Sequence, residues 1–389
     1  MKYMGHKGKL LPVLGEILKT ESASSSAIAD PFCGSAAVSW YLAQNTEKKV
    51  VSGDLQTFAT CRAAAIIQRT QSIDFNSTMK TWWKRSQKIV EDIVERFPNS
   101  ARSLEPDQQS TEDIIGLVIR SRIFCDTVLP AILAGNKHQF PMTKAYGGYY
   151  FSPLQAITLD ALRSTLPRES NARAIALASL IETASKCAAA PGHTAQPFQP
   201  TETSAKYIFE AWQRPIFKIL SEAAKSISKR HAKTAGETIT GDFNKTLSTL
   251  NSEDLVFADP PYSGVHYSRF YHVLETLAKG KEISVSGRGR YPDISQRPSS
   301  LFSQKSQAMA AAKSLVEGCH QKRLNLVLTF PSEGSSNGLS ASDFIDIGRN
   351  LFSSIKQHEI DSDFSTLGGN KIIRSARLKC KESIVCFRI

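Results

Sequence analysis

The chain has 389 residues, with 41% hydrophobic and 22% charged side chains and a formal net charge of +12. These values are those of an ordinary globular protein with room for two or three domains, and they exclude a disordered or fibrous chain. The basic balance favours a polyanionic partner and does not separate DNA, RNA and a membrane surface. No apolar run approaches the length of a membrane span.

The seven cysteines are scattered and contain no C-x-x-C pair. An odd, scattered set argues against a disulfide framework or a zinc site, so we expect no metal and a reduced, cytoplasmic setting. The N-terminal residues up to Leu18 are basic and amphipathic and lack the apolar core and cleavage site of a signal peptide, which also favours the cytoplasm.

The first 70 residues alternate between short apolar runs and helical spacing. Each apolar run ends in a carboxylate, the first at Asp30 and the second at Asp54. This alternation predicts the first half of a Rossmann-like, doubly wound and mostly parallel α/β sheet. We expect strands at 27–29 and 49–54, and helices at 9–19, 35–44 and 57–68.

The middle of the chain changes to helical patterns. It is too long for a crossover connection, so we predict a large helical insert domain at residues 75–234. Helices are expected at 79–97, 111–123, 154–166, 172–186 and 203–233, with loops at 139–151 and 190–201.

The α/β pattern then resumes, with strands that end at Asp242 and Asp259. We therefore predict a discontinuous catalytic domain made of residues 1–74 and 235–389. Its remaining helices are expected at 270–278, 303–317 and 342–352, and its remaining strands at 324–330, 355–360 and 382–388.

The tetrapeptide Asp259-Pro260-Pro261-Tyr262 follows the apolar run Leu255–Ala258. Ligands bind at such strand ends in open α/β sheets. An ionised Asp accepts hydrogen bonds, Pro leaves a carbonyl without a competing N–H, and Tyr has a flat face. The set suits a planar nitrogen heterocycle with an exocyclic amine, although a tight turn after a core strand fits equally well.

Other strand ends carry groups suited to a second ligand. Asp30-Pro31-Phe32-Cys33-Gly34-Ser35 leads from a strand through a glycine turn into a helix, whose N-terminus favours a carboxylate or phosphate. Asp54 can accept both hydroxyls of a ribose. Asp242 and Phe243 can receive an adenine amine and stack on its ring. Taken singly, each also fits an ordinary capped turn.

The basic start, Tyr3-Met4-Gly5-His6-Lys7-Gly8-Lys9, places lysines among glycines. Together with Asp30–Ser35, Gly241–Phe243 and Asp259–Tyr262, it resembles the adenine-specific DNA methyltransferases of the DNA adenine methylase (D12) family. The stretches Tyr267–His272 and Ser365–Asn370 are similar to members of that family too. His6 and Ala36 depart from it, because the family usually has glycine at both positions.

The resemblance implies a class I methyltransferase fold with S-adenosylmethionine as the methyl donor. Phe32, Gly34 and the following helix would hold the methionine part, with Asp30 in the same turn. Tyr3 and Lys7 would close over the carboxylate. Asp54 would take the ribose hydroxyls, and Asp242 with Phe243 the adenine of the cofactor.

The resemblance also implies that adenine leaves the DNA duplex, because its amine is paired and its faces are stacked. Tyr262 would stack on the flipped base. Asp259 and the Pro260 carbonyl would accept the two N6 hydrogens, and Pro261 completes the rigid turn.

The expected macromolecular partner is double-stranded DNA, with a restriction or defence protein as a second partner and no membrane. Basic side chains of this kind mainly contact phosphates and set the register of binding. The candidate DNA contacts are Arg120, Arg122, Lys144, His193, Gln196, Arg269, Arg288 and Arg290.

Two further activities offer an amine to the same acceptors, namely methylation of cytosine N4 in DNA and of adenine in RNA. N4-cytosine enzymes more often carry serine at the position of Asp259. A third alternative is a DNA-binding protein that keeps the fold without turnover. His6 and Ala36 favour this third alternative, and the complete Asp259–Tyr262 set argues against it.

Overall fold

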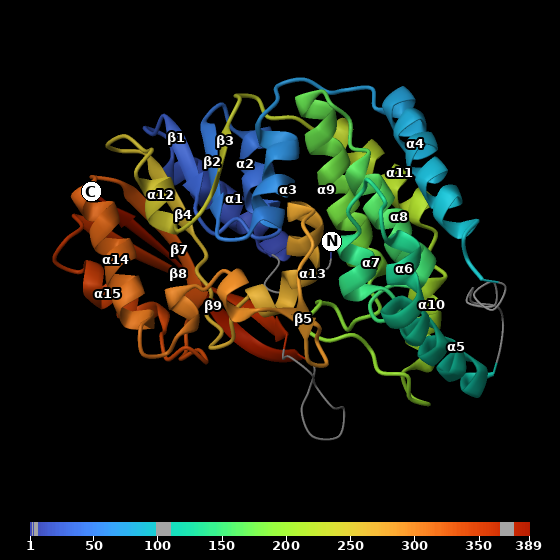
Figure 1. The fold of residues 1–389 in the computed structure, drawn as a ribbon. Helices are drawn as coiled ribbons and strands as arrows, with labels where there is room; N and C mark the ends of the chain where they lie inside the picture. The colour runs from blue at the N-terminus through green and yellow to red at the C-terminus, as the bar shows by residue number, and fades with distance from the viewer. Residues whose placement is uncertain (2, 4–6, 99–109, 366–376) are drawn as a thin grey trace. The chain divides into compact units, whose positions relative to one another are not determined.

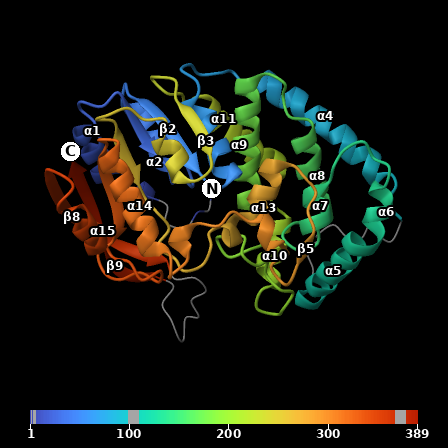
Figure 2. The same cartoon turned by 60° about the vertical axis from the view of Figure 1, so that its left-hand side comes forward.

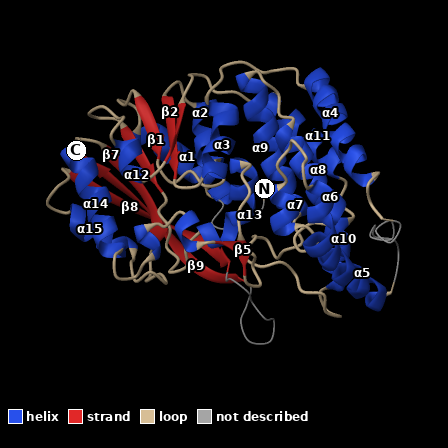
Figure 3. Ribbon diagram, in the orientation of Figure 1, coloured by secondary structure: helices blue, strands red, loops and turns tan. Residues whose placement is uncertain are grey.

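The computed structural model describes residues 1, 3, 7–98, 110–365 and 377–389 (Figure 1). The chain divides into two compact units. The sheet unit comprises Tyr3–Gln71, His231–Tyr267 and Pro298–Ile389, and the helical unit comprises Met1–Lys2, Ser72–Arg230 and Ser268–Arg297. Figure 3 shows the long strands gathered in the sheet unit.

A seven-stranded sheet forms the centre of the sheet unit, in the order β3-β2-β1-β4-β7-β9-β8. Its first five strands are parallel neighbours, and β9 pairs antiparallel with both β7 and β8. The predicted α/β class with a mostly parallel sheet is confirmed. The strands are β1 (Ala27–Asp30), β2 (Lys49–Asp54), β3 (Glu237–Thr240), β4 (Leu255–Ala258), β7 (Asn325–Pro331), β8 (Ser354–Ser365) and β9 (Arg377–Arg388).

The central strands β1 and β4 are buried at every position, because helices cover both faces of the sheet. On one face, α1 (Leu11–Glu21), α2 (Ala37–Asn45) and α3 (Thr57–Ile67) pack in sequence. On the other, α12 (Phe243–Leu247), α14 (Ala308–Gln321) and α15 (Ala341–Gly348) enclose the main apolar core (Figure 2).

The order of the strands reverses at β1. From β1 the chain proceeds outward to β2 and β3, and it then returns to β4 on the other side of β1. The carboxyl ends of β1 and β4 therefore flank the switch point where ligands bind in open α/β sheets. Asp30-Pro31 and Asp259-Pro260 lie at these two ends.

The helical unit contains nearly all of the predicted insert. Its helices are α4 (Asn76–Val94), α5 (Thr111–Ile123), α6 (Leu129–Leu133), α7 (Pro141–Tyr146), α8 (Pro153–Ser164), α9 (Ser170–Cys187), α10 (Ala205–Trp212), α11 (Ile216–Ser228) and α13 (Ser268–Lys279). A π-helical turn at Phe124–Val128 joins α5 to α6. A short hairpin pairs β5 (Val285–Ser286) with β6 (Tyr291–Pro292).

Three features of this unit differ from the sequence predictions. The helix expected at 203–233 is two helices, because Pro215 has no backbone N–H to continue the first one. Helix α7 lies inside an expected loop. Residues Ser268–Arg297 group with the helices rather than with the sheet, because α13 is buried along most of its length against α7 and α9.

Across the described ranges, no helix is long and apolar enough to cross a lipid bilayer. His6 and residues 366–370, which carry part of the family resemblance, lie outside the described residues.

Candidate active site

The turn after β1 is held in a left-handed conformation. Gly34 has φ +48° and Ala36 has φ +63°. A Cβ atom on Gly34 would lie 2.4 Å from the Tyr3 hydroxyl oxygen, so only glycine fits against the Tyr3 ring. The structure thus brings two of the predicted cofactor residues, Tyr3 and Gly34, into contact.

Helix α2 begins directly after this turn. Its N-cap residue, Ala36, offers no side-chain hydrogen bond to the first turn of the helix. The first backbone N–H groups of α2 are therefore available to a carboxylate, which is the usual ligand of such an end.

Asp54 joins the ends of β1 and β2. Its Oδ2 accepts a hydrogen bond from the Gly34 backbone N–H at 2.9 Å, and its Oδ1 accepts one from Gln56 N–H at 2.9 Å. Asp54 thus lies beside the Gly34 turn, where the carboxyl ends of β1 and β2 meet.

Asp30 is buried at the end of β1 and accepts a 2.6 Å hydrogen bond from the Ser39 hydroxyl. Burial raises its pKa to about 7, against the opposing effect of that hydrogen bond, and the charges of Asp259 and Asp54 add to the rise. Three carboxylates thus lie near one another at this edge of the sheet, an arrangement that favours a cationic ligand.

Asp242 and Phe243 follow β3. Asp242 caps α12, since its Oδ1 accepts hydrogen bonds from both the backbone and the side-chain nitrogen of Asn244. The Phe243 ring packs 5.8 Å from Phe32 and 6.0 Å from Phe302. The two predicted aromatic residues therefore meet, and Phe302 joins them from a segment that the sequence did not single out.

Asp259 lies directly after β4. Its Oδ1 accepts a hydrogen bond from the Thr329 hydroxyl at 2.9 Å and lies 3.0 Å from Lys7 Nζ. Lys7 also pairs with Glu382 on β9. Lys7, which the resemblance places over the carboxylate of the cofactor, thus contacts Asp259 in this structure.

The buried charges in this group influence one another. Burial lowers the pKa of Lys7, but the charges of Asp259 and Glu382 outweigh it, so the pKa is raised. Burial also raises the pKa of Asp259, an effect that the Lys7 charge opposes and the Glu382 charge reinforces. Lys7 remains an ammonium throughout the physiological pH range.

Asn337 holds the backbone of the Asp259–Tyr262 turn. Its Nδ2 donates to the carbonyls of Pro261 at 3.1 Å and Phe302 at 3.0 Å, and its backbone N–H donates to Tyr262 O at 3.3 Å. Within the described part of the chain, the Pro260 carbonyl makes no hydrogen bond. That oxygen is thus available to a ligand.

Tyr262 packs edge-on against Phe330, with ring centroids 6.3 Å apart. Tyr267 lies close by, and burial raises its pKa, with added contributions from Tyr262 and Asp259. Sequence reasoning missed Thr329, Asn337 and Glu382. Thr329 alone carried a signal, as a polar residue in an otherwise apolar strand.

The predicted DNA contacts all lie in the helical unit. Two of them enclose Tyr149, whose ring centroid is 4.5 Å from Arg122 Cζ and 4.0 Å from Arg290 Cζ. Arg290 also donates to the carbonyls of Ala145 and Lys144, so its guanidinium is held inside the unit.

The β5–β6 hairpin presents Arg288 at its exposed turn. The turn is anchored through Gly289, whose carbonyl accepts hydrogen bonds from the Tyr150 hydroxyl and from His272 Nε2, each at 2.9 Å. Arg269 stacks over Tyr291 of the same hairpin at 4.8 Å.

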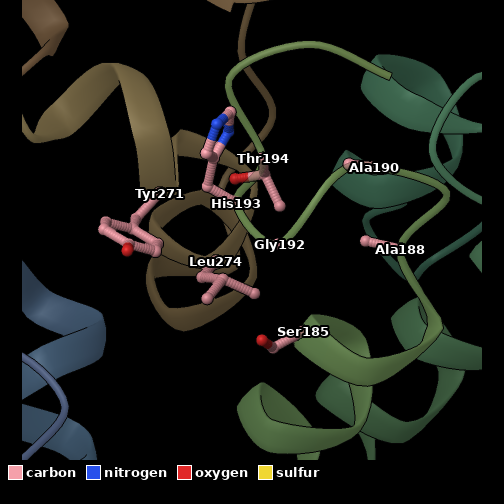
Figure 4. A pocket seen from close by; sticks show the side chains of 8 residues that line it. All are labelled: Ser185, Ala188, Ala190, Gly192, His193, Thr194, Tyr271 and Leu274. Carbon is pink, nitrogen blue, oxygen red and sulfur yellow. The ribbon is translucent and has the colours of Figure 1, made fainter. Parts of the chain in front are cut away.

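The other predicted DNA contacts differ in their exposure and in their side-chain partners. Arg120 and Gln196 are exposed, whereas Lys144 is paired with Glu282 at 2.7 Å. His193 packs edge-on against Phe270, and burial lowers its pKa. Figure 4 shows His193 beside a small pocket lined by Ser185, Ala188, Ala190, Gly192, Thr194, Tyr271 and Leu274. That lining contains no lysine or arginine, so it offers no phosphate site by itself.

The described residues contain no group of three or more His, Cys, Asp or Glu side chains that could hold a metal ion.

Comparison with known proteins adds independent evidence. The model of the "D12 class N6 adenine-specific DNA methyltransferase" family matches residues 3–126 and 133–325. The chain is 28% identical over 213 residues to the Type II methyltransferase M.FokI of Planomicrobium okeanokoites, an alignment that covers 51% of this chain and 30% of that protein. It is 22% identical over 402 residues to the modification methylase LlaI of Lactococcus lactis subsp. lactis, covering 100% of this chain and 55% of that protein. The chain thus spans between a third and about half of the length of these relatives.

Proposed function

Because the chain belongs to the D12 class N6 adenine-specific DNA methyltransferase family, we propose that it transfers a methyl group from S-adenosylmethionine to N6 of adenine in double-stranded DNA. The observation that carries the proposal is the position of Asp259–Tyr262 at the switch point of the sheet, beside the turn after β1. Two ligands can bind next to each other at this edge of the sheet, one at the turn after β1 and one at the turn after β4. Their reacting atoms would then lie close together.

The residues on the β1 side fit S-adenosylmethionine. The uncapped start of α2 suits its carboxylate, Asp54 beside the Gly34 turn would accept from its ribose hydroxyls, and the Phe32–Phe243 pair offers an apolar surface for its adenine. The carboxyl groups of Asp30 and Asp54 beside this turn favour the positive charge of the sulfonium. When bound, the cofactor supplies an electrophilic methyl group.

The residues on the β4 side suit the target base. Asp259 and the Pro260 carbonyl accept the two N6 hydrogens, which draws the nitrogen lone pair out of conjugation with the ring. Tyr262 stacks on the base. Unstacking the base costs a few kcal/mol, which these contacts offset. Orientation of the two reactants can contribute roughly 7–11 kcal/mol to lowering the barrier.

The helical unit supplies the DNA contacts in this proposal. Arg288 at the hairpin turn, Arg120 and Gln196 are exposed candidates for contact with DNA. Arg269 is exposed as well, although its guanidinium stacks over Tyr291. Arg122, Arg290, Lys144 and His193 mainly hold the unit together and shape the surface that carries the others.

The names of the two relatives, a Type II methyltransferase and a modification methylase, support a role in a restriction–modification or related defence system. A restriction protein is the partner that such a system requires. Sequencing the genomic DNA of an unmethylated host after expression of the chain will reveal the modified base and its sequence context together.

The direct test is transfer of a labelled methyl group to duplex DNA, followed by digestion to nucleosides. We expect label in N6-methyladenine. The Asp259→Ala variant should lose transfer by more than 100-fold, in line with loss of an essential acceptor in the reaction, while cofactor binding by calorimetry stays within about twofold. Label in N4-methylcytosine, or in RNA only, would reassign the substrate, and specific DNA binding without any label would support the silent DNA-binding alternative.

A further inference from the structure

We propose that Glu382 is a positioning residue for methyl transfer: it shares the Lys7 ammonium with Asp259 and thereby keeps Asp259 a strong acceptor for the amine of the target base. This inference rests on the proposed function of the Asp259 site. Glu382 does not touch the base itself in this scheme and acts through Lys7.

The geometry of the sheet brings Glu382 to this place. In the antiparallel pair β7–β9, Glu382 is opposite Pro331 and Ile384 is opposite Thr329. Residues two apart on a strand point to the same face, and opposite residues share that face. Thr329 and Glu382 therefore project on the same side, and both reach the Asp259–Lys7 pair.

Lys7 is enclosed between the two carboxylates. Its side chain is only 7% exposed, and its Nζ pairs with Asp259 Oδ1 at 3.0 Å and with Glu382 Oε1. One positive charge thus faces two negative charges. Without the Glu382 carboxylate, the Lys7 ammonium would form its ion pair with Asp259 alone.

The consequence for Asp259 follows from its two oxygens. The described contacts of the carboxylate, from Thr329 and Lys7, both fall on Oδ1. Oδ2 is the oxygen left to accept from the amine of the base. A carboxylate that is fully paired with an ammonium is a weaker acceptor, so the division of Lys7 between two partners preserves the acceptor strength of Oδ2.

The other groups near Asp259 do not offset these charges. Asp30 on β1 adds a carboxyl, and Tyr267 adds a phenol whose pKa is raised by burial. Thr329 on β7 adds a neutral donor. Within the described part of the chain, Lys7 is the cation that pairs with Asp259.

Removing the charge of Glu382 and removing the charge of Lys7 should shift the pKa of Asp259 in opposite directions. Glu382→Gln removes a negative charge near Asp259, so the pKa of Asp259 falls. The acid limb of the pH profile of the methyl-transfer rate then moves to lower pH. Lys7→Met removes the positive charge and leaves Asp259 beside Glu382, so the acid limb moves to higher pH. Each shift should be roughly one pH unit or more, the size that a neighbouring charge typically produces.

The experiment measures the single-turnover rate of methyl transfer between pH 5 and pH 9, with saturating cofactor and duplex DNA. Single turnover isolates the chemical step from product release. For Glu382→Gln we expect a several-fold lower plateau rate with an unchanged KM for cofactor, and Glu382→Asp should restore most of the rate. Glu359→Gln is the matched control, because it removes an exposed carboxylate from the adjacent strand β8, where it pairs with Lys381.

A second readout does not depend on turnover. Protein labelled with 13C at the Asp carboxyl carbon gives the titration of Asp259 directly, with Asp259→Asn providing the assignment. The apparent pKa should fall in Glu382→Gln, rise in Lys7→Met and stay unchanged in Glu359→Gln.

The outcomes separate this inference from the proposed function. An active wild type whose acid limb and Asp259 titration are unaffected by Glu382→Gln would overturn the role of Glu382 and leave the function intact. Shifts of both variants in the same direction would overturn it too, since a general loss of structure acts without regard to charge. A wild type that forms no methylated product on any nucleic acid would overturn the proposed function instead.

Discussion

At the residue scale, the candidate site is defined by carboxylates at the ends of strands. Asp30 is 1% exposed, and Asp54, Asp242 and Asp259 follow the neighbouring strands. The sequence identified all four, because an acid after a short apolar run is visible without a structure. Their separate environments were not visible, since Ser39, Thr329 and Glu382 come from other parts of the chain.

Asp30 provides a test of this burial through the pH dependence of stability. Its pKa is raised from 3.8 to about 7 in the folded chain, so the folded state binds the proton more tightly than the unfolded state. Stability must therefore fall as the pH rises from about 4 to above 7. The Asp30→Asn variant lacks the pH-dependent contribution of Asp30 to stability. Its free energy of unfolding relative to wild type should therefore rise by a few kcal/mol between about pH 4 and above pH 7. Urea unfolding at several pH values measures this difference, and a constant difference from pH 4 to pH 8 would contradict it.

At the element scale, the decisive feature is the pairing of the loop after β4 with the loop after β7. The backbone carbonyls of Pro261 and Tyr262 both accept hydrogen bonds from Asn337 in the second loop. Asn337 is 1% exposed and also donates to Phe302 O. One amide side chain thus holds three segments that are distant in sequence.

Asn337→Ala should loosen this arrangement. Buried carbonyls at Pro261 and Phe302 lose their donor, which costs about 1–3 kcal/mol of stability. Because the Asp259–Tyr262 turn then loses its support, the rate of methyl transfer should fall more than cofactor affinity does. Thermal unfolding and single-turnover rates measure the two effects. Ser336→Ala is the control, because Ser336 lies next to Asn337 but is exposed. Its hydroxyl donates to Tyr262 O at 3.4 Å and accepts from Gly264 N–H at 3.0 Å, both at exposed positions. Equal losses in both variants would show that Asn337 has no special role.

The helical boundaries also belong to this scale. The long helix expected at 203–233 is broken at Pro215, and α7 forms inside an expected loop beginning at Pro141. Proline is favoured at the first position of a helix, which is where Pro141 lies, and Pro215 immediately precedes α11 as its N-cap residue. The local signal was present in each case, but the surrounding periodicity was given more weight.

At the scale of the whole molecule, the chain has a formal net charge of +12. The structure divides the predicted DNA contacts into exposed arginines, such as Arg288, and arginines that are held by their own unit, such as Arg290. Charge alone does not distinguish these two kinds, whereas their contacts do.

The two arginines of the hairpin turn should therefore respond differently to substitution. Arg288→Ala should weaken DNA binding and lower the slope of log affinity against log salt concentration by about 1, with little change in stability. Arg290→Ala should destabilise the helical unit by about 1–3 kcal/mol, because its hydrogen bonds to Ala145 O and Lys144 O are lost. Fluorescence anisotropy at several salt concentrations and thermal unfolding measure the two properties. A reduced salt slope for Arg290→Ala without a loss of stability would reverse this assignment.

The sequence by itself determined the α/β class, the acidic residues at the strand ends and the family of the chain. It could do so because hydrophobic periodicity and short motifs are local properties. Only the tertiary structure decided that Lys7 pairs with Asp259, that Glu382 shares Lys7, that Asn337 holds the turn and that Ser268–Arg297 joins the helices. These contacts join residues tens to hundreds of positions apart. Their partners are selected by strand register and burial, which no local pattern in the chain records.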